Sequence, residues 1–115
     1  MKNDMDNCIF CKIIKGEIPC SKVYEDDDMI VFNDIEPKAK VHMLCVPKSH
    51  FKLLAEADEE QMATVAKCLK KIPEIAQKAG LENGYRIIIN QGDDAGQTVF
   101  HLHIHVLGGE KLKDF

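Results

Sequence analysis

Apolar residues occur along the chain in short runs separated by polar turns, a pattern typical of β-strands. An acidic turn at residues 25–28 separates the first two runs, because aspartates favour turns and cannot be buried together. Pro47 stops the third run, since proline cannot donate a hydrogen bond to a strand ladder. The predicted strands cover residues 23–24, 30–32, 41–46, 85–89 and 98–107.

Residues 58–80 follow a different spacing, in which apolar residues recur every three or four positions and predict one long helix. These apolar residues are Met62, Val65, Ala66, Leu69, Ile72, Ala76 and Ala79. Asp58 and Gln61 have the spacing of a helix N-cap and its capping-box partner, and Gly80 ends the pattern. A short helix is predicted over residues 9–14, closed by Gly16.

These elements together predict an α+β fold: an antiparallel sheet of about five strands, with one long helix and a short N-terminal helix. No repeat, low-complexity tract or linker divides the sequence, so residues 1–115 are expected to form a single domain. The proportions of hydrophobic residues (45%) and charged residues (30%) are typical of a soluble globular protein.

Charge and hydropathy exclude some kinds of partner. Nineteen acidic residues against fifteen basic ones give a net charge of −4, which argues against a broad basic surface for nucleic acid. No run approaches the roughly 18 apolar residues of a membrane span. The first seven residues are polar and lack the apolar core of a signal peptide. We therefore expect a cytoplasmic protein that binds neither nucleic acid nor a membrane.

The strongest chemical signal is the run His-Leu-His-Ile-His that begins at residue 101. On a strand, alternate side chains share one face, so His101, His103 and His105 would lie in a row about 6.6 Å apart. The two apolar residues between them would point the other way, into a core. Only two other histidines occur in the chain, so three in one row favour a chemical role over a merely polar surface.

Two kinds of chemistry fit this row. A cupin-like metal site uses His-x-His followed by Glu, here His103, His105 and Glu110, but such barrels need another strand and a fourth ligand further on. Phosphate chemistry needs less, because a neutral imidazole can attack phosphorus and protonated neighbours can bind its oxygens. The loop before the row could hold a phosphate through backbone N–H groups, an amide and a hydroxyl. Its candidate residues are Gly92, Gly96, Gln97 and Thr98. We favour phosphate chemistry.

The alternation of histidine and apolar residues over 101–107 resembles the signature of the histidine triad (HIT) superfamily of nucleotide hydrolases and transferases. The likeness extends over residues 9–109, through IFCKIIKGEIP, VFNDI, HMLCVPKSH, GYRIIINQG and AGQTVFHLHIHVLGG. The Leu-Gly-Gly ending is similar to that of the Hint branch, the nucleoside phosphoramidases. The branch that hydrolyses diadenosine polyphosphates typically continues with Pro-Arg instead.

The resemblance implies an enzyme that hydrolyses the P–N bond of purine nucleoside 5′-phosphoramidates and releases the nucleoside monophosphate. His103 would be the nucleophile that forms a nucleotidyl-histidine, with His42, His101 and His105 completing the catalytic network and no cofactor required for catalysis. One alternative is a dinucleoside polyphosphate hydrolase, which the missing Pro-Arg argues against. Another is a nucleotide-binding adaptor whose hydrolysis is incidental, since a binding module could keep the whole triad.

The resemblance also implies a nucleotide site. Asp34, which by itself is also typical of a structural turn, would bind both ribose hydroxyls. The base pocket would be formed by Ile9, Phe10, Ile13, Phe32 and Ile35. The phosphate site would be formed by Asn90, Gly96, Gln97 and Thr98, together with His103 and His105. The tail after residue 109 departs from the Trp-containing tails of better-known members, so the leaving group stays open.

Cys8 and Cys11 form a C-x-x-C pair within a set of five cysteines. An odd count without an export signal argues against a disulfide scaffold, and the pair alone is compatible with redox activity, metal binding or neither. Zinc would need two further nitrogen or sulfur ligands. The resemblance supplies them, because many bacterial triad proteins with this pair complete a structural zinc site at the positions of His50 and His101.

The resemblance further implies a homodimer, in which the long helix and the penultimate strand pair with their copies. The sequence adds an argument of its own, since the strand predicted at residues 85–89 is apolar and would be an aggregation-prone edge if left open.

Overall fold

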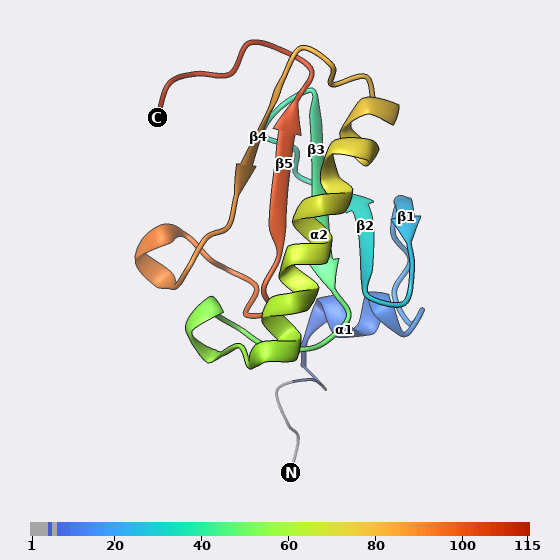
Figure 1. The fold of residues 1–115 in the computed structure, drawn as a ribbon, viewed down its shortest axis with the longest axis vertical. Coiled ribbons are helices and arrows are strands. Elements are labelled where there is room, and N and C mark those ends of the chain that lie inside the picture. Colours follow the sequence, from blue (N-terminus) through green and yellow to red (C-terminus); the bar gives the residue numbers. More distant parts are fainter. Residues whose placement is uncertain (1–4, 6) are drawn as a thin grey trace.

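The structure, a computed structural model that describes residue 5 and residues 7–115, contains one five-stranded antiparallel sheet. The strand order is β1-β2-β3-β5-β4, and helix α2 lies across one face of the sheet (Figure 1). The strands are β1 (Lys22–Glu25), β2 (Met29–Asn33), β3 (Val41–Pro47), β4 (Tyr85–Ile88) and β5 (Ile104–Gly108). The predicted α+β class is confirmed.

Both predicted helices are present, as α1 (Ile9–Ile14) and α2 (Glu59–Lys78). The predicted capping box is confirmed: Asp58 Oδ1 accepts from the Gln61 backbone N–H at 2.8 Å, and Gln61 Oε1 accepts from the Asp58 N–H at 3.0 Å. The chain leaves α2 at Gly80, whose φ of +82° is a conformation that suits glycine. Two short 3₁₀ helices, Leu54–Glu56 and Asp93–Ala95, lie in the connecting loops.

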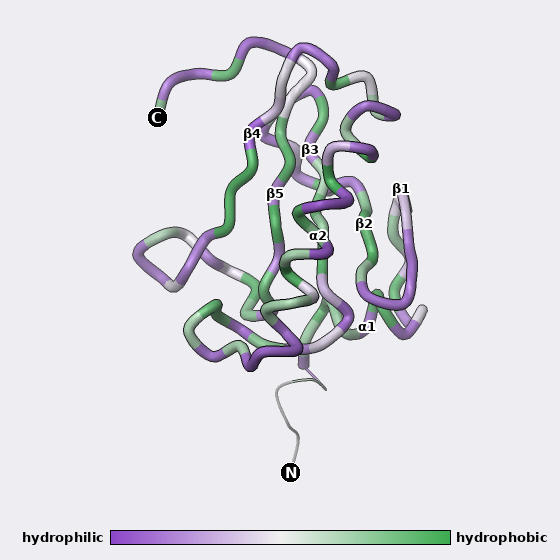
Figure 2. The backbone as a smooth tube through the Cα atoms, in the orientation of Figure 1, coloured by the Kyte–Doolittle hydropathy of each residue, from purple (hydrophilic) through white to green (hydrophobic). Residues whose placement is uncertain are grey.

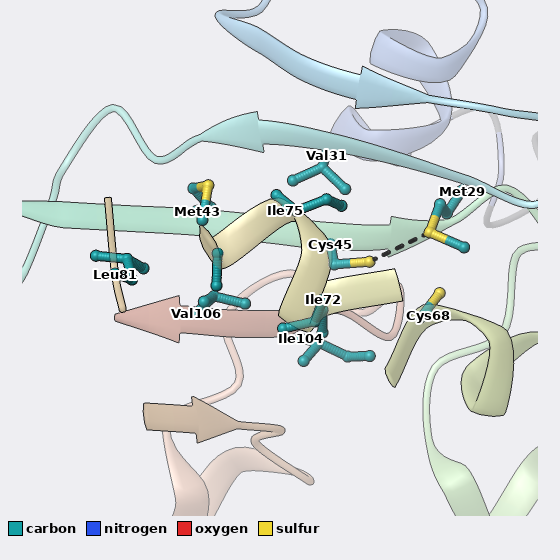
Figure 3. Packing of buried hydrophobic residues seen from close by; sticks show 11 residues of the cluster. Met29, Val31, Met43, Cys45, Cys68, Ile72, Ile75, Leu81, Ile104 and Val106 are labelled. Atoms are coloured by element: carbon teal, nitrogen blue, oxygen red, sulfur yellow. Dashed lines mark hydrogen bonds between the residues drawn. The ribbon is translucent and has the colours of Figure 1, made fainter. Parts of the chain in front are cut away.

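Both faces of the central strands are buried, which is why their sequences are continuously apolar rather than alternating. The apolar stretches of β3 and β5 stand out in Figure 2. Between the sheet and α2, side chains such as Cys45, Ile72 and Ile104 form one core (Figure 3). On the opposite side, α1 packs Phe10 and Ile13 into a second core that includes residues of β2 and β3.

The last strand begins later than the sequence predicts. It starts at Ile104 rather than at residue 98, so His101 and His103 precede it. The preceding residue Leu102 is fully buried beside Phe51, and its N–H donates to the Phe51 carbonyl at 2.7 Å. This bond between distant parts of the chain takes the place of a strand ladder. The prediction that one strand carries all three histidines is therefore wrong, although their rings remain close: Phe10 contacts both His101 and His103, and His103 contacts His105.

The histidines are also more buried than a row on an outer face would be. His101 is 0% exposed and His103 is 8% exposed. Both rings contact Phe10 of α1, yet the two histidines serve different sites.

Strand β4 lies at one edge of the sheet, and its Ile87 side chain is 40% exposed. This is the apolar edge on which the predicted homodimer would pair, and the dimer itself stays a prediction. Within the part of the chain that the structure describes, no helix combines the length and the apolarity that a membrane crossing requires.

Candidate functional site

A cleft of about 680 Å³ opens on the side of the sheet that carries α1. It lies between α1, the end of β2, residues 34–38 and the segment that leads into β5. Of the residues predicted to bind a nucleotide or its phosphate, all but Gly92 and Gln97 line this cleft. They are Ile9, Phe10, Ile13, Phe32, Asp34, Ile35, Asn90, Gly96, Thr98, His103 and His105.

Gln97 has a different position from the one expected. Its side chain is buried, and its Oε1 accepts from the Gly92 N–H at 2.8 Å. Its Nε2 donates to the carbonyls of Lys52 at 3.0 Å and Val99 at 3.3 Å. The Gln97 amide was expected to contact a phosphate. It instead stabilises the loop by forming hydrogen bonds with backbone groups outside the cleft.

The protonation of His103 is fixed by a backbone group. Its Nδ1 lies 2.7 Å from the carbonyl oxygen of His101. A carbonyl can only accept, so Nδ1 carries the hydrogen and donates it. Burial lowers the pKa of His103, against smaller opposing effects of this hydrogen bond and of Asp34, which favours the neutral ring. In that ring the free lone pair is on Nε2, the atom that a nucleophile needs.

A series of hydrogen bonds runs from the Lys38 backbone through His42 to His105 and fixes which nitrogens carry hydrogen. The Lys38 backbone N–H donates to His42 Nδ1 at 3.0 Å, so His42 carries its hydrogen on Nε2. That hydrogen points to His105 Nδ1 at 2.9 Å, which leaves the hydrogen of His105 on Nε2. The Asn90 side-chain amide lies 3.4 Å from this Nε2, and it can accept the hydrogen only when its oxygen, rather than its nitrogen, faces the ring. Burial is the main reason why the pKa of His105 falls to about 4. The cleft thus contains an imidazole lone pair on one ring and an imidazole N–H on its neighbour.

Asp34 lines the cleft and lies close to His42, the middle member of this series of hydrogen bonds. Its Oδ2 lies 3.5 Å from His42 Nε2, and its Oδ1 accepts from the Glu36 N–H at 2.9 Å in a local turn. Asp34 opposes the effect of burial on the pKa of His42, which is lowered overall. The carboxylate is therefore oriented and partly exposed to the cleft, where it can accept hydrogen bonds from a ligand.

The His101 ring takes no part in the hydrogen bonds of His42 and His105 and faces Cys8 and Cys11 instead. Its Nε2 lies 2.7 Å from the Pro47 carbonyl and must donate to it, so its lone pair is on Nδ1. That Nδ1 lies 3.4 Å from Cys8 Sγ, 3.6 Å from Cys11 Sγ and 3.2 Å from His50 Nδ1. Cys11 Sγ lies 3.3 Å from His50 Nδ1. The structure brings together all four residues predicted to bind metal, here called the metal group.

The spacing of the metal group fits a tetrahedral ion. Typical bonds of zinc to sulfur and nitrogen would place the two nitrogens about 3.3 Å apart and each sulfur about 3.6 Å from each nitrogen. The donor atoms of the group lie close to these separations and all within 4.8 Å of one another. Burial, with a further contribution from Cys8, raises the pKa of Cys11 to about 12, so a cation would be needed to hold the thiolate. The group can hold a metal ion.

Three contributors to these sites are backbone atoms that sequence reasoning missed. The Pro47 carbonyl orients His101, the His101 carbonyl orients His103, and the Lys38 N–H orients His42. The residue type gives no signal for any of them, since other residues offer the same backbone groups. Glu110, considered for a cupin-like site, accepts from the Lys40 N–H at 2.7 Å instead.

Comparison with known proteins agrees with this geometry. The HIT domain family matches residues 15–112. Protein HitA from Neisseria gonorrhoeae is 52% identical over 104 residues, which cover 90% of this chain and 97% of HitA. The solved structure of a HIT family hydrolase from Clostridium thermocellum has a TM-score of 0.91 and 44% identity, with 96% of each chain covered.

A zinc-bound histidine triad family protein from Mycobacterium smegmatis is also similar in structure. It has a TM-score of 0.81 and 35% identity, and the match covers 95% of this chain and 81% of that protein. The family match spans most of the chain, and the curated relative is similar over almost its whole length. This protein belongs to the HIT domain family.

Proposed function

We propose that this HIT-family hydrolase cleaves the P–N bond of purine nucleoside 5′-phosphoramidates through a nucleotidyl-histidine on His103. One observation carries the proposal: the bond from His103 Nδ1 to the His101 carbonyl leaves Nε2 as a nucleophile in the cleft. The dinucleoside polyphosphate and adaptor alternatives share this geometry, and the Leu-Gly-Gly ending without Pro-Arg favours the phosphoramidate.

In the first step, the lone pair of His103 Nε2 attacks the α-phosphorus. A P–Nε2 bond forms as the P–N bond to the leaving amine breaks. The amine leaves as a neutral molecule only if it gains a proton. The neutral His105 ring has one hydrogen, on Nε2, and would become an anion if it lost it, so His105 donates a hydrogen bond to the leaving nitrogen while a water molecule passes on a proton from solvent. In the second step, a water molecule adds to phosphorus, releases a proton to solvent and breaks the P–Nε2 bond. The products are the amine and the nucleoside monophosphate.

The remainder of the cleft suits a nucleoside. The apolar side chains of Phe10, Ile13 and Phe32 form a wall against which a flat base can pack. Asp34 has an oriented carboxylate for the ribose hydroxyls. The preference for a purine rests on the family resemblance.

We further propose that the metal group holds structural zinc. Two sulfur and two nitrogen donors in a buried, four-ligand group favour zinc over harder cations. His103 is not a member of the group, so the metal would stabilise the fold and take no part in the chemical steps.

The substrate proposal predicts that purified protein turns over adenosine 5′-phosphoramidate faster than diadenosine tetraphosphate, under the same conditions. Product AMP separated by chromatography gives both rates. Faster release of nucleotide from the tetraphosphate would instead support the polyphosphate alternative. AMP binding without turnover of either compound would support the adaptor.

His103→Ala should lower turnover on the order of 10⁴-fold or more, because it removes the atom that attacks phosphorus. The affinity for AMP should change less than about tenfold, since the base wall and Asp34 are separate groups. Steady-state kinetics and calorimetric titration with AMP measure the two effects, and the melting temperature checks folding. Substantial residual turnover would remove His103 from the nucleophile role.

Asp34→Asn should weaken AMP binding roughly 10- to 100-fold, because a charge-assisted hydrogen bond to a hydroxyl is lost. Binding of 2′-deoxy-AMP should weaken less. The asparagine oxygen can still accept from the Glu36 N–H, so the local turn is kept. Asp27→Asn, at an exposed position in the turn at residues 25–28, is the matched control and should change neither affinity. Equal losses for both nucleotides would exclude Asp34 from the ribose site.

Protein purified without chelator or a metal-affinity tag should contain one zinc per chain by elemental analysis. The double variant Cys8→Ser/Cys11→Ser should contain none and melt at a lower temperature, because zinc binding in such groups contributes on the order of 10 kcal/mol to folding. Cys20→Ser, which lies outside the metal group, should keep the zinc. Metal-free parent protein whose melting temperature is unchanged by chelator would contradict the zinc proposal.

A further inference from the structure

Helix α1 belongs to both sites at once. Cys8 caps its N-terminus and Cys11 lies in its first turn, and both are members of the metal group. Ile9, Phe10 and Ile13 of the same helix line the nucleotide cleft. Since the helix has only six residues, a displacement at one site moves the other.

Phe10 is the direct link to the reacting group. Its ring lies edge-to-face against the His103 ring, with centroids 5.0 Å apart and an interplanar angle of 86°. It makes a similar contact with Phe32 at 5.7 Å, and its side chain is only 6% exposed. The position of Phe10 therefore helps to set both the base wall and the orientation of the His103 ring.

The position of α1 depends on contacts outside the helix, because six residues are too few to form a stable helix alone. Apart from apolar packing, α1 is tied through its two sulfurs to His50, which follows β3, and to His101, which precedes β5. A bound ion would replace these contacts of 3.3–3.6 Å with four metal–ligand bonds. Metal binding therefore favours the arrangement of α1 in which Phe10 meets His103.

We propose that a metal ion in the metal group and a nucleoside monophosphate in the cleft bind cooperatively, with Phe10 of α1 as the positioning residue that couples them. The coupling is reciprocal: the factor by which zinc tightens nucleotide binding equals the factor by which nucleotide tightens zinc binding. A factor of about tenfold is expected, within the usual range of such couplings. The proposal rests on the nucleotide binding proposed above.

The first experiment measures the Kd of AMP by calorimetric titration of the zinc-loaded protein and of the protein freed of metal by a chelator. Binding about tenfold tighter to the zinc-loaded form is expected. The same Kd in both forms would overturn the coupling. Absence of AMP binding to both forms would instead contradict the proposed function, so the two failures are distinguishable.

The second experiment starts from the zinc-loaded protein and withdraws the metal by degrees. Cys8 and His50 line a second cavity of about 380 Å³ beside the metal group. Competition with a chelator gives the zinc affinity with and without saturating AMP. The same tenfold increase is expected with AMP, and an unchanged zinc affinity would overturn the proposal.

Two variants of α1 separate this route from a general stabilisation of the fold. Phe10→Ala should weaken AMP binding to the zinc-loaded protein and reduce the effect of AMP on zinc affinity to less than about twofold. Ile14→Ala is the matched control, because Ile14 is on the same helix and packs on the core without lining the cleft. It should keep the tenfold effect. Equal loss of the effect in both variants would show coupling through overall stability and contradict the role of Phe10.

Discussion

Three backbone groups decide which nitrogen carries the hydrogen on His42, His101 and His103. The Pro47 carbonyl holds the hydrogen of His101 on Nε2, and the His101 carbonyl holds the hydrogen of His103 on Nδ1. The Lys38 N–H does the converse for His42, whose Nδ1 must accept. Imidazoles of the same chemical type thereby offer different atoms: His101 a lone pair toward the cysteines, His103 a lone pair in the cleft, and His42 an N–H toward His105. Burial reinforces this division, since it disfavours the charged rings in which both nitrogens would carry a hydrogen.

The fold makes these backbone groups available in a buried place. Because β5 begins only at Ile104, the two preceding histidines lie in an irregular segment whose carbonyls are not all used by a strand ladder. The His101 carbonyl can then accept from a side chain. A strand running through all three histidines would have engaged this segment in pairing. The same irregular segment lets His101 face the metal group while His103 faces the cleft.

The sequence predicts most of the elements, because their signals are local. The helix beginning after Asp58 and the strand that ends at Pro47 follow from periodicity and from residues with strong conformational preferences. The start of the last strand cannot be predicted in this way, because apolar residues alternate both in strands and in other buried extended segments. What decides it is the bond from Leu102 to Phe51, a contact between residues distant in sequence.

The site residues also differ in how far the sequence predicts them, because local spacing is visible in the sequence and contacts between distant residues are not. The Cys8–Cys11 spacing and the histidine run are visible in the sequence, whereas the choice of His50 needed the family resemblance. For Gln97, the residue type indicates an amide but not which atoms the amide will contact.

The central claim is the protonation of His103, and ¹⁵N NMR of the imidazole nitrogens tests it directly. At neutral pH, in protein without nucleotide, the account predicts a protonated Nδ1 and an unprotonated Nε2 on His103. A hydrogen on Nε2 of this residue, in either the neutral or the charged ring, would contradict it, because the lone pair that the proposed attack on phosphorus requires would then be absent.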